Sequence, residues 1–246
     1  MVKKFLLIYL LIGFFGYTLF KTKEPKILDI TSINGQVTSE VKEVLTMEVI
    51  KANVLIHASS YQDIIGIKLK EIKQIGSGVI IDERDGYYFL LTNAHVISFR
   101  YELSKFRYKI FDYQGNSYQA SLIELSLEDD LALLKFKKSR ELKVISLSKD
   151  MVKSHDIIYA IGNPKDVSNC ISVGEVNSFT KIAYTDYEVI NHSAEIDSGN
   201  SGGMLINESY ELIGINTWAY FDKSGNYKSS LAIPNDIIYK FLGLRH

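Results

Sequence analysis

The stretch "EIDSGNSGGMLI", residues 195–206, places a serine among three glycines directly before an apolar run. Glycine, asparagine and serine favour turns, and Met204, Leu205 and Ile206 are typical of the start of a buried strand. Two interpretations are open: Ser201 is a nucleophile held on a tight bend, or it belongs to an ordinary surface turn. A serine nucleophile needs a base and an acid that orients the base. The rest of the sequence therefore has to decide between the two interpretations.

A histidine and an aspartate that fit these roles precede Ser201. His95 follows an apolar strand in "LLTNAHVI" (90–97), and Asp130 stands at the start of the apolar run Leu131–Phe136 in "DDLALLKF" (129–136). A carboxylate that enters a buried strand is costly unless a group donates to it, and a histidine ring N–H is such a group. His95 would take the proton of Ser201, and Asp130 would hold the required tautomer.

The glycines around Ser201 suit the same chemistry. Gly199 can adopt backbone angles that leave its N–H, together with that of Ser201, directed at a developing oxyanion. "GNSGG" also fits the G-x-S-x-G pattern of α/β-hydrolases, in which the histidine follows the serine. Only the C-terminal His246 follows Ser201 here, and the surrounding pattern is that of strands. The α/β-hydrolase alternative is therefore excluded.

The hydrophobic pattern after residue 47 predicts an all-β fold. Thirteen short apolar or alternating runs are separated by turn residues such as Asp85-Gly86, and this spacing is typical of a β-sandwich or a pair of barrels. The first three of these runs are read as "EVIKANVLIHAS", "DIIGIKLKEI" and "GSGVIID". Only the last segment, "NDIIYKFLGLRH" (235–246), has helical spacing, with Asn235 expected as its N-cap.

The N-terminal residues differ in composition from the rest of the chain. Phe5 to Phe20 is an uncharged, mainly apolar run with lysines on both sides, slightly short for the hydrocarbon core of a bilayer. We expect residues 1–23 to be an uncleaved signal anchor, with a cleaved signal peptide as the alternative. Residues 24–44 are expected to be a tether, and residues 45–246 the folded domain. The domain would then lie outside the cytoplasm, in the periplasm or the extracellular space, held at the membrane or secreted.

The order of motifs resembles trypsin-like serine peptidases of the bacterial HtrA/DegP type, in the chymotrypsin superfamily. The matching segments run through the folded part in family order: "GSGVII" (76–81), "LLTNAHVI", "DDLALLKF", "YAIGNP" (159–164), "SVGEVN" (172–177), "SGNSGG" (198–203), "GINTW" (214–218) and "LAIPND" (231–236). The resemblance implies two six-stranded β-barrels, with His95 and Asp130 from the first and Ser201 from the second. It also implies that Asn216 to Trp218 pair with an extended substrate.

The sequence departs from this family in two places. Only ten residues follow Asp236, so the resemblance includes no PDZ domain. Asn200 stands where digestive trypsin relatives carry an aspartate that pairs with a freed N-terminus, so activation by cleavage is not expected.

The resemblance places Glu195, six residues before Ser201, at the base or wall of the primary specificity pocket. A carboxylate there would favour a substrate Lys or Arg. In the alternative, Glu195 turns outward or meets a lysine, and Ile196, Thr217 and Ala232 shape a pocket for small aliphatic side chains. Trp218 and Ala219 complete the expected substrate-binding residues.

The sequence therefore predicts a serine endopeptidase that acts on proteins or peptides through an acyl-enzyme. No cofactor, metal or nucleic acid is implied: the net charge is −1, and the histidines outside the triad lack metal-ligand spacing. The alternative is a catalytically silent protein that keeps the fold to bind extended peptides.

Overall fold

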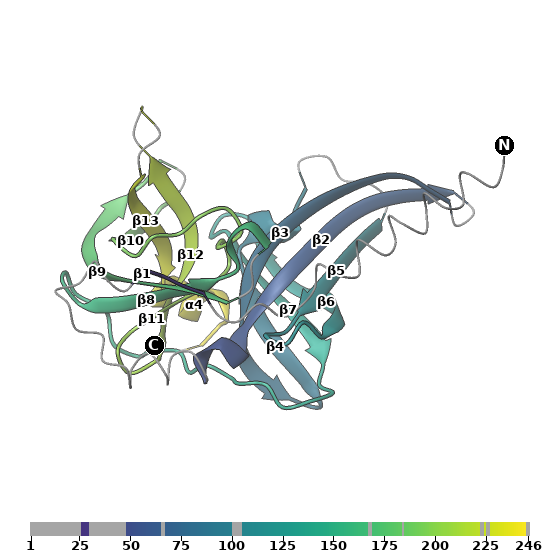
Figure 1. Cartoon of the computed structure of the whole chain (residues 1–246), viewed down its shortest axis with the longest axis horizontal. Coiled ribbons are helices and arrows are strands. Elements are labelled where there is room, and N and C mark those ends of the chain that lie inside the picture. The colour runs from purple at the N-terminus through teal and green to yellow at the C-terminus, as the bar shows by residue number, and fades with distance from the viewer. Residues whose placement is uncertain are drawn as a thin grey trace.

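The computed structural model describes residues 26–29, 48–64, 67–99, 105–166, 169–183, 185–221, 224 and 227–244. These residues form two β-barrels side by side, followed by a short helix, α4 (Asn235–Phe241) (Figure 1). The predicted all-β fold with two six-stranded barrels and a C-terminal helix is confirmed.

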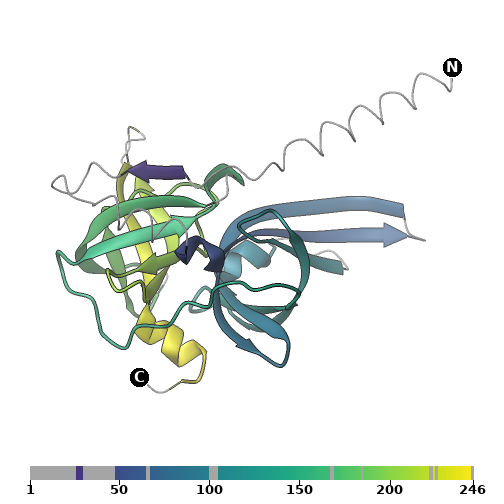
Figure 2. The ribbon, with the colours of Figure 1, turned by 60° about the horizontal axis from the view of Figure 1, so that its bottom comes forward.

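The first barrel is closed by six antiparallel strands in the order β2-β3-β4-β7-β6-β5. The strands are β2 (Asn53–Ile64), β3 (Ile67–Arg84), β4 (Tyr87–Thr92), β5 (Lys105–Phe111), β6 (Ser117–Ser126) and β7 (Leu131–Lys137). A 3-10 turn, η1 (Val49–Ala52), precedes β2. The paired strands β2 and β3 extend beyond the rest of the barrel as a long hairpin (Figures 1 and 2).

The strand boundaries at the start of this barrel differ from the prediction. The three runs read over residues 48–82 form the turn η1 and one hairpin, because β3 continues through Gly76 and Gly78. A Cβ atom at Gly78 would lie 2.9 Å from the side chains of Ile56 and Leu90, and one at Gly76 would lie 2.6 Å from Val96. These glycines allow close packing inside the barrel and do not end the strand.

The second barrel contains six strands and one added strand at its edge. β8 (Ile157–Gly162), β9 (Cys170–Lys181), β10 (Glu188–His192), β13 (Tyr227–Pro234), β12 (Leu212–Phe221) and β11 (Met204–Ile206) form the ring. The first half of β9 pairs with β8 and the second half with β10, and this change of partner closes the barrel. β1 (Lys26–Asp29) pairs with β9 in parallel, so part of the segment predicted as a tether is a strand.

Three clusters of buried apolar residues hold the barrels together. One fills the first barrel around Ile56, Leu90 and Leu134, and another lies in the second barrel around Ile190 and Leu205. The largest joins residues of both barrels, including Leu91 and Leu131 of the first and Met204 and Ile215 of the second. Because this contact is apolar and buried, the barrels are held in a fixed relation and residues from both can form one site.

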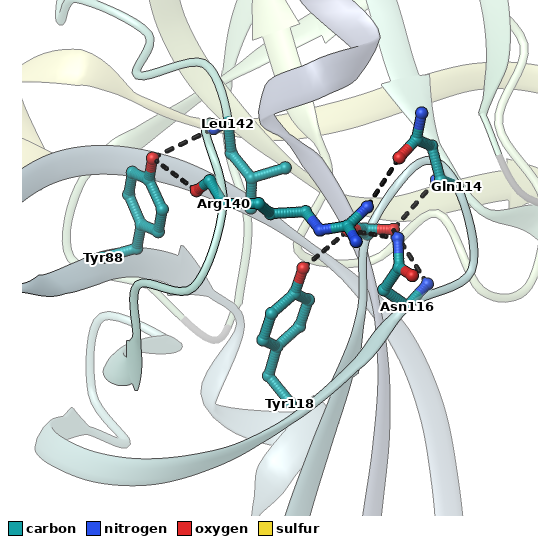
Figure 3. Close-up of polar contacts among 7 residues, drawn as sticks. Tyr88, Gln114, Asn116, Tyr118, Arg140 and Leu142 are labelled. Carbon is teal, nitrogen blue, oxygen red and sulfur yellow. Dashed lines mark hydrogen bonds and ion pairs between the residues drawn. The ribbon is translucent and has the colours of Figure 1, made fainter.

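The segment that joins the barrels, residues 138–156, is fastened to the first barrel by polar contacts. The hydroxyl of Tyr88 donates to the carbonyl of Arg140 (3.2 Å) and accepts from the N–H of Leu142 (2.9 Å) (Figure 3). The guanidinium of Arg140 donates to Gln114 (2.7 Å) (Figure 3). It also lies 3.9 Å from the Asp112 carboxylate, which accepts from the Asn116 and Tyr118 side chains. These contacts hold the start of the joining segment on the first barrel.

The predicted C-terminal helix lies within the described residues, whereas the predicted N-terminal membrane segment does not. α4 begins at Asn235, and Pro234 takes the N-cap position that was predicted for Asn235. The Asn235 side chain instead donates to the carbonyls of Ser148 and Asp150. The predicted membrane segment, residues 5–20, lies outside the described residues. Among the residues that are described, no helix is long and apolar enough to span a bilayer.

Candidate active site

His95 lies on a one-turn helix, α3 (Ala94–Ile97), directly after β4. Its neighbours Ala94, Val96 and Ile97 are buried, whereas the His95 side chain is 44% exposed. The flanking apolar residues therefore fix the helix on the first barrel and leave the imidazole at the surface of the site.

The Asp130 carboxylate holds the His95 ring. His95 Nδ1 lies 2.8 Å from Asp130 Oδ2, and the His95 backbone N–H donates to Asp130 Oδ1 (2.9 Å). The Thr217 hydroxyl, from β12 of the second barrel, also donates to Oδ2 (3.0 Å). An ionised carboxylate only accepts hydrogen bonds, so Nδ1 carries the ring hydrogen and Nε2 is left as an acceptor. This tautomer is the one that a general base requires.

The backbone at Asp130 is in the left-handed region, with φ of 52°. Its carbonyl accepts from the Ala94 N–H (3.1 Å) and from the Asn93 side chain (3.0 Å), which clamps it against α3. A left-handed non-glycine residue is strained, and such strain persists only where neighbouring contacts impose it. Here these contacts direct the carboxylate toward His95.

Ser201 lies on the tight loop before β11, between two glycines with positive φ. Gly199 has φ of 99° and Gly202 has φ of 84°. A Cβ at Gly202 would lie 2.2 Å from the Ser77 carbonyl oxygen, and one at Gly199 would lie 2.6 Å from the Asn163 carbonyl oxygen. Any side chain at these two positions would displace the loop. The Ser201 hydroxyl donates to the Thr217 carbonyl (3.0 Å), on the strand that also contacts Asp130.

The loop leaves two backbone donors available, two positions apart in the sequence. The N–H groups of Asn200, Gly202 and Gly203 donate within the second barrel, at 2.9 Å each. Those of Gly199 and Ser201 have no hydrogen-bond partner in the described part of the chain. Two unpaired N–H groups beside a serine hydroxyl are the donor set that an oxyanion hole needs.

The expected substrate-binding residues have three different placements. Glu195 is exposed. Ile196 and Ala232 are buried in the apolar cluster of the second barrel, with Ala219 at its edge. Thr217 is buried and directs its hydroxyl to Asp130.

A cleft of about 240 Å³ lies beside the imidazole. It is lined by His95, Asp130, Leu127, Glu128, Thr185 and Trp218, so residues of both barrels form its walls. Leu127 is 71% exposed. Of the expected substrate-binding residues, Trp218 is the one that reaches this cleft.

His192 is the buried histidine of the second barrel, at the end of β10. Both ring nitrogens are buried without a hydrogen-bond partner among the described residues. Burial lowers the pKa of His192 to about 3, and the nearby Ala194 backbone and Asn216 side chain oppose this only in part. His192 is therefore neutral at physiological pH. The described residues contain no group of histidine, cysteine and acidic side chains that could hold a metal ion.

Three residues that position the serine loop were not identified from the sequence as site residues. The Ser77 N–H donates to the Ser201 carbonyl (2.8 Å), and the Ser77 hydroxyl donates to the Gly199 carbonyl (2.7 Å). The Lys165 N–H donates to the Ser198 carbonyl (2.7 Å), and the Lys165 ammonium forms an ion pair with Asp197. This ion pair lowers the pKa of the Asp197 carboxyl.

The comparison with protein families agrees with this geometry. Residues 76–215 match the family described as the trypsin-like peptidase domain. The chain belongs to this family. The expected relationship to HtrA/DegP proteins is confirmed by relatives such as Serine protease HTRA1 of Xenopus tropicalis, 35% identical over 178 residues. Periplasmic serine endoprotease DegP of Salmonella typhimurium (strain LT2) is 32% identical over 177 residues.

These similarities cover 70% of this chain but 36% of each relative, so the chain matches about a third of their length. A solved structure of a variant of the HtrA-type protease AlgW with a tripeptide superposes with a TM-score of 0.66 at 26% identity. That superposition covers 82% of this chain and 62% of the AlgW chain.

Proposed function

We propose that this chain is a serine endopeptidase with His95, Asp130 and Ser201 as its catalytic residues. The observation that carries the proposal is the set of contacts at the Asp130 carboxylate. It is bound by the backbone N–H of His95, by Nδ1 of the His95 ring and by the Thr217 hydroxyl. These contacts fix the imidazole in the tautomer that can accept a proton from Ser201. A purely structural aspartate would not need an exposed histidine as its partner.

In the proposed reaction, the Ser201 hydroxyl turns from the Thr217 carbonyl to Nε2 of His95. Oγ then bonds to the substrate carbonyl carbon while its proton passes to Nε2. The carbonyl oxygen becomes negative and is bound by the N–H groups of Gly199 and Ser201. His95 returns the proton to the leaving amine as the C–N bond breaks. Water then attacks the acyl-enzyme by the same route, which releases the acid and restores Ser201.

The substrate class is protein or peptide. An extended peptide beside β12 could pair with the backbone near Trp218, as in other cases of strand addition. The cleft beside His95 and Trp218 would receive a side chain next to the cleaved bond. The relatives named above are serine proteases, which supports this class of substrate.

A fluorophosphonate probe tests the proposal against the silent peptide-binding alternative. The probe reacts with a serine only where a base and an oxyanion site activate it. Labelling of wild type at Ser201 is expected, and a wild-type chain that binds peptides but takes no label would support the alternative.

We predict that Glu195 does not select basic substrate residues. The Glu195 side chain is exposed, so a substrate lysine would gain only a solvent-screened interaction there. Cleavage profiling of wild type and Glu195→Ala on a peptide mixture is expected to give the same preference for small aliphatic residues. A wild-type preference for Lys or Arg that disappears in Glu195→Ala would show that the carboxylate acts in the pocket.

We also propose that residues 5–20 hold the protein at a membrane, with the barrels outside the cytoplasm. The support is the apolar run between lysines and the periplasmic relative from Salmonella. The full chain is expected in the membrane fraction, and a chain that starts at residue 24 is expected in the soluble fraction with its activity intact. Starting at residue 24 keeps β1, which pairs with β9. A mature N-terminus just after residue 20 would favour the cleaved signal peptide.

A further inference from the structure

Lys165 contacts the serine loop twice, although 36 positions of sequence separate it from Ser201. It lies in the 3-10 turn η2 (Pro164–Asp166), directly after β8, with φ of 52° and ψ of 37°. Its N–H donates to the Ser198 carbonyl (2.7 Å), and its ammonium pairs with the Asp197 carboxylate. The left-handed backbone is unfavourable for a lysine, and strain of this kind is common where a loop serves a site.

The contact with the Ser198 carbonyl determines where the Gly199 N–H points. In a trans peptide the C=O and the N–H point in opposite directions. Because the Ser198 carbonyl faces the Lys165 N–H, the Gly199 N–H faces away from Lys165. The same reasoning applies to Ser201, because the Asn200 carbonyl accepts from the Gly203 N–H (2.9 Å). The two unpaired donors are therefore each set by a bond on the opposite side of their own peptide.

The Gly199 peptide needs such an external contact. Glycine adopts positive and negative φ about equally, so the 198–199 peptide could turn over at little cost from Gly199 itself. A peptide turned in that way would direct the Ser198 carbonyl oxygen, in place of the N–H, at the developing oxyanion. Asn200 is neutral, and its side-chain oxygen is buried without a partner among the described residues. The ion pair next to this peptide is the one between Lys165 and Asp197.

We propose that Lys165 is a positioning residue, and that its ion pair with Asp197 holds the Gly199 peptide in the orientation that binds the oxyanion. This inference rests on the proposed function, because it assigns a role within that catalytic site. The ion pair acts through the loop: the Asp197 carboxylate also accepts from the Ser198 N–H (2.6 Å), and the Asp197 carbonyl accepts from the Asn200 N–H (2.9 Å). Holding Asp197 therefore holds the turn that contains the peptide.

The Lys165–Asp197 ion pair is exposed, so a positioning role can be distinguished from a contribution to the stability of the domain. The side chains are 71% exposed for Lys165 and 41% for Asp197. Exposed ion pairs contribute little to the stability of a whole domain. Loss of the pair should consequently change the turnover rate while the melting temperature stays nearly constant.

The test compares three variants of the full chain: Lys165→Met, Asp197→Asn and the double variant. Asparagine at position 197 can still accept from the Ser198 N–H, so this change removes the charge and keeps the turn. Each variant is expected to lower kcat about fivefold, a modest loss because an exposed ion pair is weakened by solvent. KM should stay close to the wild-type value. The rate of fluorophosphonate labelling should fall by the same factor as kcat, since that reaction also uses the oxyanion site.

Matched controls identify the charge as the cause. Lys165→Arg keeps a cation at this position and is expected to recover most of the rate. Lys153→Met removes another exposed lysine, in the segment that joins the barrels and outside the serine loop, and should leave kcat unchanged. Raising the salt concentration should reduce the difference between wild type and Lys165→Met, because salt screens exposed charges.

The double variant is expected to lose no more than either single variant, because both changes remove one interaction. Wild-type kcat in Lys165→Met, or losses that multiply in the double variant, would overturn the inference. If Lys165→Met fails to fold, Asp197→Asn measures the same ion pair. Failure of the proposed function is a different result: Ser201 would take no label even in wild type. A labelled wild type with unaffected Lys165 and Asp197 variants contradicts the positioning role alone.

Discussion

Replacing Ser201 with alanine is expected to lower kcat/KM on peptide substrates by at least about 10⁴-fold, and His95→Ala by a similar factor. The first change removes the nucleophile. The second removes the group that accepts its proton, and the neutral serine hydroxyl left behind is a poor nucleophile. Because the two side chains act in one step, kcat/KM of the double variant should lie within about threefold of the value for either single variant. Steady-state kinetics and fluorophosphonate labelling measure both effects.

Two variants control for general disturbance of the chain. His155 has φ of 73° and an exposed side chain near Glu175, so His155→Asn removes an imidazole and suits the left-handed backbone. Ser178→Ala removes an exposed hydroxyl that contacts only Thr180 among the described residues. Both should retain wild-type rates. Cleavage by Ser201→Ala at the wild-type rate would mean that another group is the nucleophile.

The sequence predicted those parts of the site that lie in short motifs. The glycines next to Ser201 are needed where they stand, because their positive φ values and close backbone contacts leave no room for a side chain. The apolar residues before His95 and after Asp130 correctly predicted β4 and β7, the strands next to which these two residues lie. Local pattern and local chemistry agree at these positions, and such agreement makes them predictable.

The contacts that hold the loop could not be predicted in this way. Ser77 and Gly199 are 122 positions apart and meet only because the barrels pack together. The roles of Ser77 and Lys165 also depend on backbone N–H groups, which every residue other than proline carries, so their residue type gives no indication. The left-handed backbone of Lys165 is imposed by neighbouring contacts against the preference of its residue type, whereas an aspartate such as Asp130 adopts this region more readily.

The prediction for Thr217 shows the same limit. Its neighbourhood in the "NTW" motif indicated substrate contact, yet its hydroxyl donates to Asp130 at 3.0 Å. A hydroxyl can serve either purpose, and only the spatial position of Asp130 decides. The side chain of Thr217 thus connects the second barrel to the carboxylate of the first, while its carbonyl receives the Ser201 hydroxyl.

Asp130→Asn is expected to lower kcat by about 10⁴-fold at neutral pH, with the fold intact, because it changes the tautomer of His95. The carboxylate now accepts three hydrogen bonds, from the His95 N–H, the His95 ring and Thr217. An asparagine has one acceptor oxygen and one NH₂ group at these two positions. The backbone N–H of His95 cannot become an acceptor, so the amide oxygen must face it and the NH₂ group must face the ring.

Facing that NH₂ group, the imidazole must accept at Nδ1 and carry its hydrogen on Nε2. The Thr217 hydroxyl can rotate to accept as well, so this arrangement satisfies every partner and the variant should fold. His95 then has no lone pair for the Ser201 proton, whereas substrate binding is unaffected, so KM should change little while kcat falls. The neighbour supplies the control: Asp129 is buried and contacts Ser126 and Lys240 rather than His95, so Asp129→Asn should retain most of the rate. Stopped-assay kinetics on the two variants decide the matter, and an Asp130→Asn enzyme within tenfold of wild type would show that the carboxylate does not set the tautomer of His95.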